Sequence, residues 1–392
     1  MILHIDFNSY FATVEQQANP RLRGKPVGVT GGDRMQRTVL GAASVEAKKY
    51  GVKTGMQIWE ARQLCPQIIL VQGDSDKYLE VTKRFIGILK AYSPYLEVFS
   101  IDECFLEGTV KIAKEIKKRI KTEIGEYITC SIGISYNKLM AKLAGSLQKP
   151  DGLVVIPDEH SAMQILDKIE LDEICGIGSR IQARLNKMGI FNFKQLRQVP
   201  LEMLLFHFKS YGKFLYDASR GIDHSQIVPF YEKEEVKSVG HRHTINHDTN
   251  NPQEIKQILL KLCEMVAMRL RSKNLVAKTI YSTFRVEQIR HLSQQTTISY
   301  TNDGLEIFQA AWGIFNCLWN REKIRMIGVS VSNLKPQTPY TLNFFKNEII
   351  NQVLDKVNNE FGNFTLQRAV LLNSTSIKRK PNPYLSDRRF KL

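Results

Sequence analysis

The sequence predicts an α/β (α+β) fold in which helices pack on a mainly antiparallel sheet. Short apolar runs alternate with segments whose apolar residues recur every three or four positions, so strands and helices are expected to alternate. The apolar runs on either side of residues 102–103 are so close together that we expect a hairpin there. The 392 residues, 43% of them hydrophobic, are enough for about two to four domains that each have a core.

The first 166 residues carry this alternation most clearly. Residues 2–7 form an apolar run that predicts a core strand ending at Asp6. Residues 20–73, interrupted by several Pro and Gly, predict a small insertion of turns, short strands and short helices. The elements expected after it are a helix at 74–92, a hairpin at 96–106, a helix at 112–124, a strand at 127–134 and a helix at 137–147.

The rest of the chain divides at polar segments. Residues 167–230 predict mostly short helices, and the charged run 231–236 predicts a linker. A Pro-containing linker after residue 334 leads to a helix at 346–360 and a basic tail. Between the two linkers we expect a second α/β unit, with strands at 239–245, 278–287, 296–300 and 324–332 and helices at 252–273 and 303–319.

The charge of the chain indicates a polyanionic partner. There are 55 Lys and Arg against 39 Asp and Glu, a net charge of +16. Basic side chains that neutralise phosphates release condensed counterions, so nucleic acid is the expected partner and a solvated basic surface is the alternative. The sequence has no run long enough for a membrane span, no secretory signal pattern, and six widely spaced cysteines that suit neither a zinc site nor a disulfide framework. A cytoplasmic location is therefore expected.

Three carboxylates are the strongest candidates for chemistry. Asp6 ends a strand that otherwise looks buried, where an unpaired acid would be costly. Asp102 and Glu103 are adjacent, and since consecutive strand residues point to opposite faces, both can reach one metal site only if the backbone bends between them. Phosphoryl transfer to a 3′-hydroxyl benefits from two Mg²⁺ ions, which prefer carboxylate oxygens. The alternative is a turn cap at Asp6 and an exposed hairpin tip at residues 102–103.

Five motifs place these acids in a wider pattern. They are Asp6-Phe-Asn-Ser-Tyr-Phe-Ala12, Glu46-Ala-Lys-Lys-Tyr-Gly-Val52, Ser100-Ile-Asp-Glu-Cys-Phe-Leu106, Ser131-Ile-Gly-Ile-Ser-Tyr-Asn-Lys138 and Lys149-Pro-Asp-Gly152. In their order and spacing the motifs resemble those of the Y-family, or translesion, DNA polymerases, and of the DinB-like branch in particular. The similarity continues with less specific residues through about residue 345.

The resemblance implies a right-hand polymerase fold with an additional DNA-gripping domain, the little finger. The implied domains are a palm at 1–19 and 74–166, fingers at 20–73, a thumb at 167–230, a little finger at 237–335 and a C-terminal tail at 336–392. Their boundaries agree with the breaks in the apolar pattern.

The resemblance also implies a metal site of two Mg²⁺ ions. The ligands would be Asp6, the backbone carbonyl of Phe7, Asp102 and Glu103. Asn8 stands where the family often has a second acid, two residues after the first. Because that acid is not generally a ligand, we expect little loss from the replacement.

The nucleotide-binding residues implied by the resemblance are Tyr10, Phe11, Lys48 and Lys149. Phe11 falls at the steric gate, a ring that the 2′-hydroxyl of a ribonucleotide would strike, and an ordinary core aromatic is the alternative. Lys149 would contact the triphosphate as a point charge, and an exposed loop lysine is the alternative. Ala42 and Val45 stand where the family commonly offers Thr and Tyr to the triphosphate, and they cannot hydrogen-bond phosphate with their side chains. Similar replacements occur in the UmuC-like branch.

A helix-hairpin-helix is expected at residues 175–189. Gly176 and Gly178 would let the backbone approach a phosphate, and the N–H groups at the start of the following helix would point toward it. Arg180 would add positive charge. A plain helix cap is the alternative.

Two further contacts are expected in the second half of the chain. Arg242 and Arg285, on predicted strands, would follow the phosphate backbone of DNA, and solvated surface charges are the alternative. Residues 340–345 resemble the peptide that binds the bacterial sliding clamp, and a docked tail strand is the alternative. Its apolar anchors would be Leu342, Phe344 and Phe345.

The predicted function is low-fidelity, template-directed DNA synthesis past lesions, without proofreading. Deoxynucleotides would be added to a primer 3′ end, with primer-template DNA, deoxynucleoside triphosphates and a sliding clamp as partners and a monomer as the working form. One alternative is a non-catalytic DNA-binding accessory of the same fold, which the replacements Ala42 and Val45 would suit. Another is a two-metal nuclease, which also needs clustered acids.

Overall fold

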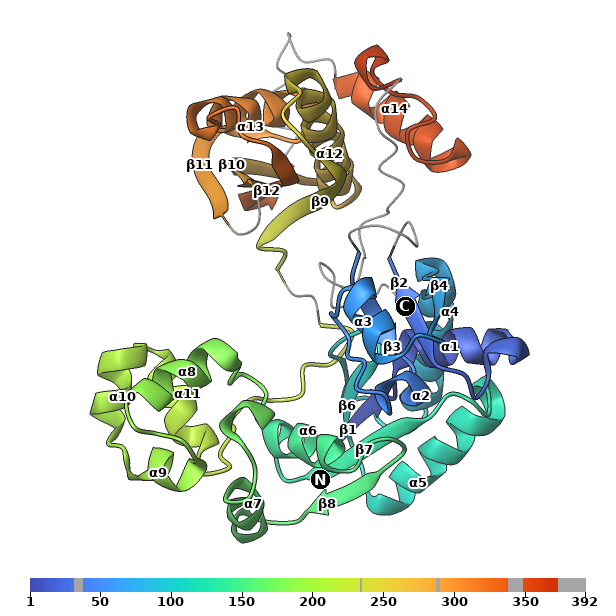
Figure 1. Cartoon of the computed structure of the whole chain (residues 1–392), viewed down its shortest axis with the longest axis vertical. Coiled ribbons are helices and arrows are strands. Elements are labelled where there is room, and N and C mark those ends of the chain that lie inside the picture. Colours follow the sequence, from blue (N-terminus) through green and yellow to red (C-terminus); the bar gives the residue numbers. More distant parts are fainter. Residues whose placement is uncertain (32–37, 233–234, 287–289, 338–347, 373–392) are drawn as a thin grey trace. The chain divides into compact units, whose positions relative to one another are not determined.

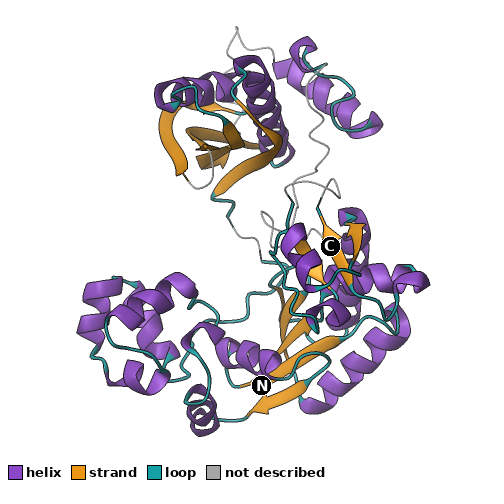
Figure 2. Ribbon diagram, viewed as in Figure 1, coloured by secondary structure: helices purple, strands orange, loops and turns teal. Residues whose placement is uncertain are grey.

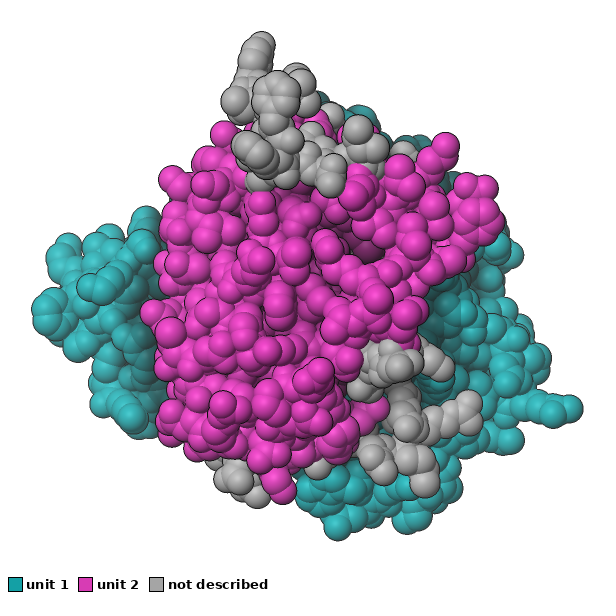
Figure 3. All heavy atoms as spheres, turned by 90° about the horizontal axis from the view of Figure 1, so that it is seen from above, with its two compact units in different colours: residues 1–233, 383–392 teal, residues 234–382 magenta. Residues whose placement is uncertain are grey.

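The computed structural model describes residues 1–31, 38–232, 235–286, 290–337 and 348–372. The chain divides into two compact units at residues 233–234 (Figures 1 and 3). Within these ranges, the first unit contains a five-stranded and a three-stranded sheet, and the second contains a four-stranded sheet. Both units combine helices with sheets, as the sequence predicts (Figure 2).

The five-stranded sheet is mainly antiparallel, as expected, and only its β7–β8 pair is parallel. The hairpin expected around residues 102–103 is confirmed as the β5–β6 pair. The strands in spatial order are β5 (Leu96–Val98), β6 (Glu103–Glu107), β1 (Ile2–Phe7), β7 (Cys130–Ser135) and β8 (Leu153–Ile156).

Helices cover both faces of this sheet. The helices α4 (Ser75–Lys90) and α5 (Val110–Arg119) share a core with Leu3, Ile5 and Phe7 of β1. The helix α6 (Lys138–Leu147) packs on the other face, against β7, β1 and β8. Its close approach requires Gly133 of β7, because a Cβ there would lie 2.0 Å from the carbonyl oxygen of Ala141.

The predicted insertion forms a small sheet with its own core. The strand β2 pairs in parallel with β4 and antiparallel with β3. Leu40, Ala47 and Ala61 belong to the buried cluster beneath it. The elements are β2 (Val27–Thr30), β3 (Leu40–Ala43), α2 (Val45–Lys48), α3 (Ile58–Leu64) and β4 (Ile69–Gln72). The helix before them, α1 (Tyr10–Ala18), shares the core of the five-stranded sheet.

The segment 167–230 is mostly helical, as predicted, but its last ten residues differ. Residues 221–230, which we call the strap, lie against the five-stranded sheet: the Phe230 N–H donates to the Leu96 carbonyl at 2.8 Å, and the Asn137 amide donates to the Gly221 carbonyl at 2.7 Å. The charged side chains of Glu97 and Lys138 bind the strap, a role that was not predicted from the sequence. The helices before it are α7 (Glu159–Leu166), α8 (Ser179–Lys187), α9 (Phe193–Gln198), α10 (Leu201–Phe208) and α11 (Tyr211–Ala218).

The second unit is an antiparallel sheet with two long helices on one face. Core residues such as Ile280 and Phe284 of β10 pack against those helices. A further helix, α14 (Glu348–Phe361), is joined to them by a bidentate ion pair between Arg271 and Asp355. In spatial order the strands are β11 (Arg290–Thr301), β10 (Leu275–Val286), β12 (Ile324–Pro336) and β9 (Ser238–Thr249), and the helices are α12 (Pro252–Ser272) and α13 (Gly304–Leu318). None of the helices in the described ranges combines the length and the apolar character that crossing a bilayer requires.

Candidate active site

Strand β1 separates core residues from site residues by its alternation. Leu3, Ile5 and Phe7 are buried toward α4 and α5, so His4 and Asp6 point to the opposite face, where α6 lies. A Cβ added to Gly145 of α6 would lie 3.0 Å from His4 Nδ1, which shows how closely the helix covers this face. Asp6 is next to the last residue of β1, so its carboxylate is not covered by the middle of the helix.

The hairpin brings Glu103 beside Asp6 and places Asp102 in the adjoining bend. Glu103 opens β6 and is the register partner of Asp6, so both carboxylates leave the same face of the sheet. Asp102 precedes it in a bend where the Phe99 and Ser100 N–H groups both donate to the Glu103 carbonyl, at 3.0 and 3.1 Å. The Phe7 N–H donates to the Asp102 carbonyl at 3.0 Å and holds this bend against the end of β1. The bend required by the sequence argument is therefore present.

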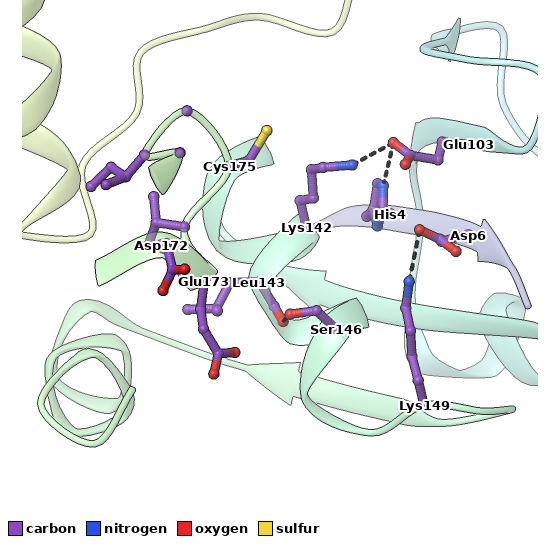
Figure 4. A pocket seen from close by; sticks show the side chains of 14 residues that line it. His4, Asp6, Glu103, Lys142, Leu143, Ser146, Lys149, Asp172, Glu173 and Cys175 are labelled. Carbon is purple, nitrogen blue, oxygen red and sulfur yellow. Dashed lines mark hydrogen bonds and ion pairs between the residues drawn. The ribbon is translucent and has the colours of Figure 1, made fainter. Parts of the chain in front are cut away.

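Two lysines neutralise the acids (Figure 4). Lys149 Nζ lies 2.9 Å from Asp6 Oδ2, and Lys142 of α6 forms an ion pair with Glu103. His4 Nε2 lies 3.5 Å from the same Glu103 oxygen. Asp102 accepts a hydrogen bond from the Ser100 hydroxyl at 2.6 Å.

These surroundings move the pKa values of the adjacent acids in opposite directions. Loss of hydration raises the pKa of Asp102 to about 6, and the charges of Asp6 and Glu103 act in the same direction. Partial burial alone would raise the pKa of Glu103, but His4 and Lys142 outweigh it and lower that pKa to about 2. Burial also lowers the pKa of His4, so its imidazole is neutral near pH 7.

The arrangement fits a divalent cation. Ligand atoms of His4, Asp6 and Glu103 lie within 4.8 Å of one another. Carboxylate oxygens suit Mg²⁺, and a cation would relieve the repulsion from Asp6 and Glu103 that adds to lost hydration in raising the pKa of Asp102. His4 was missed by the sequence reasoning, although its position two residues before Asp6 on a strand places both side chains on one face.

A cleft of about 470 Å³ opens beside the carboxylates. One side is lined by Asp6, Glu103, Lys142 and Lys149, and the other by residues 172–178 of the helical segment (Figure 4). Lys142 was also missed by the sequence reasoning, because helical spacing alone does not show that α6 crosses the sheet at Gly133.

The predicted nucleotide-binding residues differ in their surroundings. Phe11 is half-buried and its ring stacks on Tyr78, with centroids 4.5 Å apart. Tyr10 is 3% exposed and its hydroxyl donates to the Tyr78 carbonyl at 2.8 Å, so only its backbone could meet a nucleotide. Lys48 lies at the surface of the protein. Partial loss of hydration and the neighbouring Lys149 lower its pKa, while Asp6 acts in the opposite direction.

The two departures in the insertion lie in different surroundings. Ala42 is 6% exposed and belongs to the main core, and Val45, the first residue of α2, is half-buried. Neither side chain can donate a hydrogen bond to phosphate.

The predicted DNA-binding glycines flank a tight turn. Gly176 has a φ of +105°, which favours glycine, and a Cβ there would lie 2.7 Å from the Phe214 ring. Gly178 precedes the first turn of α8, and Arg180 in that turn is exposed. The backbone therefore turns sharply just before a helix N-terminus, as the motif predicts.

In the second unit, Arg242 and Arg285 lie on the sheet face opposite the helices. Arg242 is paired with Gly328, where a Cβ would lie 2.5 Å from the arginine Cγ, so its stem crosses the sheet surface at that glycine. Arg285 is half-buried on the neighbouring strand β10. The predicted clamp anchors Leu342, Phe344 and Phe345 lie outside the described residues.

Comparisons with known proteins match three segments of the chain to family models. Residues 5–146 match the model of the impB/mucB/samB family, residues 236–344 match the C-terminal domain of the same family, and residues 172–223 match the DNA polymerase-iota thumb domain. The chain is 36% identical to DNA polymerase IV of Pelotomaculum thermopropionicum, covering 97% of both chains. It is 30% identical to DNA polymerase IV 1 of Bacillus subtilis, covering 99% of this chain and 97% of that one.

A solved structure gives the same result. The Y-family DNA polymerase chimera Dbh-Dpo4(243-245)-Dbh superposes with a TM-score of 0.75 at 26% identity, covering 86% of this chain and 99% of that chain. The right-hand polymerase fold predicted from the motifs is therefore confirmed. The chain belongs to the impB/mucB/samB family, which places it among the Y-family DNA polymerases, in the DinB-like branch.

Proposed function

We propose that the cleft beside Asp6 adds deoxynucleotides to a primer 3′ end by a two-metal mechanism, copying damaged templates without proofreading. The chain is a DNA-directed DNA polymerase, as its family membership implies. The observation that carries the proposal is the register pairing of Asp6 with Glu103, with Asp102 in the adjoining bend. Asp6 and Glu103 thereby lie close together, and Asp102 is near enough for their charges to raise its pKa.

The acids Asp6, Asp102 and Glu103, with the Phe7 carbonyl, would hold two Mg²⁺ ions. Bound there, the metal would lower the pKa of the primer 3′-hydroxyl and neutralise charge on the triphosphate. Lys149 and Lys48 would bind the triphosphate, whose negative charge would draw the Lys149 ammonium away from Asp6. Phe11, held by its stack on Tyr78, would lie beneath the sugar.

The DNA would be held by contacts with its phosphates. Gly176, Gly178 and Arg180 present backbone N–H groups and a cation at the start of α8. Arg242 and Arg285 share one face of the second sheet, which suits a phosphate backbone running along it.

From the family membership we also propose the roles of the domains. They are a palm (1–19 and 74–166), fingers (20–73), a thumb (167–230) and a little finger (237–335). A monomer in the cytoplasm is the proposed working form.

Primer extension tests the catalytic proposal. Purified protein with Mg²⁺ should extend a primer on undamaged and lesion-bearing templates, and Asp6→Asn should lower the rate by about a thousandfold, because a ligated metal contributes several kcal/mol to transition-state stabilisation. Lys118→Met, an exposed change on α5, is the control. No incorporation by the unaltered protein would favour a non-catalytic accessory, and DNA cleavage without nucleotide would favour a nuclease.

Two parts of the proposal have separate tests. Absence of proofreading predicts that a 5′-labelled primer with a mismatched end is extended or left intact and never shortened.

We also propose that residues 340–345 bind a bacterial sliding clamp. Deleting them should remove stimulation of primer extension by the clamp and leave unstimulated extension unchanged. Stimulation that survives the deletion would show that the clamp binds elsewhere.

A further inference from the structure

The segment 148–152, between α6 and β8, carries Lys149 and is folded tightly on itself. Asp151 has a φ of +57°, and a Cβ at Gly152 would lie 1.9 Å from the Gln148 carbonyl oxygen. Lysine has a long flexible stem, so the place of its ammonium depends on how firmly its backbone is held. The contacts that hold this segment therefore bear on the distance between Lys149 and Asp6.

Asn8 connects this segment to the strand that carries Asp6. Its side chain is buried, with 4% of the residue exposed. Its Oδ1 accepts from the Asp151 N–H at 2.8 Å and from the Thr129 hydroxyl at 3.1 Å, and its amide donates to the Ser131 hydroxyl at 3.0 Å. Because Asn8 is two residues after Asp6 and Asp151 is two residues after Lys149, this one side chain ties the two ends of the Lys149–Asp6 contact together.

Lys117 of α5 holds the same segment from another side. Its Nζ donates to the carbonyls of Asp151, Cys130 and Gly152 at 2.6, 2.9 and 3.1 Å. It also lies 2.7 Å from the Asp151 carboxylate, and its side chain is only 20% exposed. One ammonium thus joins three backbone carbonyls of two segments, and charge-assisted hydrogen bonds of this kind are stronger than neutral ones.

We propose that Asn8 and Lys117 are positioning residues that fix the segment 148–152 so that Lys149 is aimed at the triphosphate. The inference rests on the proposed role of Lys149 in nucleotide binding. Neither residue touches the nucleotide in this proposal: both act through the backbone of residues 151–152. Their loss raises the KM for nucleotide more than it lowers kcat, because the acids on β1 and β6 keep their places.

A steady-state comparison of four variants tests the proposal. Lys149→Met should raise the KM for deoxynucleoside triphosphate by about tenfold, since it removes a charged hydrogen-bond donor. Lys117→Met and Asn8→Ala should each raise it by about fivefold, through misplacement of the lysine. Lys118→Met is the matched control on α5, because its side chain is exposed and it removes the same charge. It should leave the KM unchanged.

Double variants distinguish positioning from a general structural effect. Combining Lys117→Met with Lys149→Met should raise the KM no further than Lys149→Met alone, because the positioned group is already gone. A multiplicative effect would overturn the inference, as would a raised KM in Lys149→Met without one in Lys117→Met. An unchanged KM in Lys149→Met would instead overturn the proposed nucleotide contact on which the inference rests.

Two further measurements guard against a folding defect. Hydrogen exchange of the Asp151 and Gly152 amides should become faster in Lys117→Met and Asn8→Ala and stay unchanged in Lys118→Met, at equal Tm. Asn8→Asp should keep its KM within about twofold of the unaltered protein, since a carboxylate still accepts from Asp151 and Thr129 and the Ser131 hydroxyl can reverse its bond. If Asn8→Ala does not fold, Lys117→Met alone decides, and unchanged exchange there would overturn the inference.

Discussion

Burial beside Asp6 and Glu103 brings the ionisation of Asp102 close to the physiological pH range. Its pKa of about 6 lies above the ordinary value of 3.8 because of lost hydration and the neighbouring acids. In the metal-free protein the protonated form therefore contributes stability that is fully present below pH 3.8 and is lost as the pH rises through about 6. A cation bound to the ionised carboxylate must displace this proton.

We therefore expect Mg²⁺ to stabilise the protein more strongly at about pH 7.5 than at about pH 5. The measurement is the rise in Tm on adding Mg²⁺ at each pH, with Asp102→Asn as the control that removes the pH dependence. The pKa of Glu103, about 2, leaves that acid ionised at both pH values. An equal rise in Tm at both would contradict a role for Asp102 in metal binding.

Phe11 is a second residue whose surroundings predict a measurable effect. Its ring is held by the stack on Tyr78, whose hydroxyl donates to the buried Glu15 carboxylate at 2.8 Å. Phe11→Ala should relax discrimination against ribonucleotides by about tenfold, since the clash with the 2′-hydroxyl disappears. The measurement is the ratio of kcat/KM for deoxy- and ribonucleotides, with Phe206→Ala, an 81% exposed residue, as control. Unchanged sugar selectivity would remove the gate role.

At the scale of elements, the position of α6 on the sheet depends on Gly133. A Cβ there would lie 2.0 Å from the Ala141 carbonyl oxygen and 2.1 Å from the Gly145 nitrogen, both helix backbone atoms. Gly133→Ala should therefore lower the free energy of unfolding by about 3 kcal/mol and reduce activity, because α6 carries Lys142 into the cleft.

Denaturant unfolding measures this effect, and a second glycine provides the control. Gly87, inside α4, has open space around an added Cβ. Gly87→Ala should raise the free energy of unfolding by about 0.5–1 kcal/mol, since alanine restricts the unfolded chain and favours a helix. Equal effects of the two substitutions would show that α6 does not depend on close contact with β7.

At the scale of the whole molecule, the strap determines where the connection to the second unit begins. Glu97 accepts the Val228 N–H at 2.8 Å and pairs with Lys138 at 2.7 Å, and both charged side chains are about one-eighth exposed, at 13% and 12%. With the strap in place, the connection starts after residue 230 and not at residue 221. Releasing the strap would lengthen it from the 7 residues 231–237 to the 17 residues 221–237.

Glu97→Gln should therefore lower stability and weaken DNA binding together. Breaking a buried ion pair by removing one partner costs about 3 kcal/mol. The affinity for primer-template DNA should fall about fourfold, because effective concentration between linked modules decreases roughly as the −3/2 power of tether length. Fluorescence anisotropy with labelled DNA measures this, and Glu80→Gln, in an exposed pair with Arg84, is the control. Lower stability without weaker binding would rule out the tether effect.

Local patterns were sufficient to predict the elements and to single out the acids as candidates. The apolar run at residues 2–7, the hairpin around residues 102–103 and the helices at 74–92 and 137–147 all follow from periodicity and turn residues, which act over a few positions. Asp6, Asp102 and Glu103 were identified because their motifs are short and ordered along the chain. The antiparallel pairing follows from local signals only at the β5–β6 hairpin, where turn residues join two adjacent strands.

Only the tertiary structure decided which side chains surround those acids. His4, Lys142 and Asn8 come from a strand face, a helix crossing and a buried hydrogen-bond network, and each contact joins residues far apart in the sequence. The opposite pKa shifts of Asp102 and Glu103 show the consequence, since the surroundings move two adjacent carboxyl groups of one motif in opposite directions. Sequence alone determined the fold class and singled out the carboxylates as candidates, because secondary structure and motif order are local properties. The charge state and the support of the site are set by packing between distant segments.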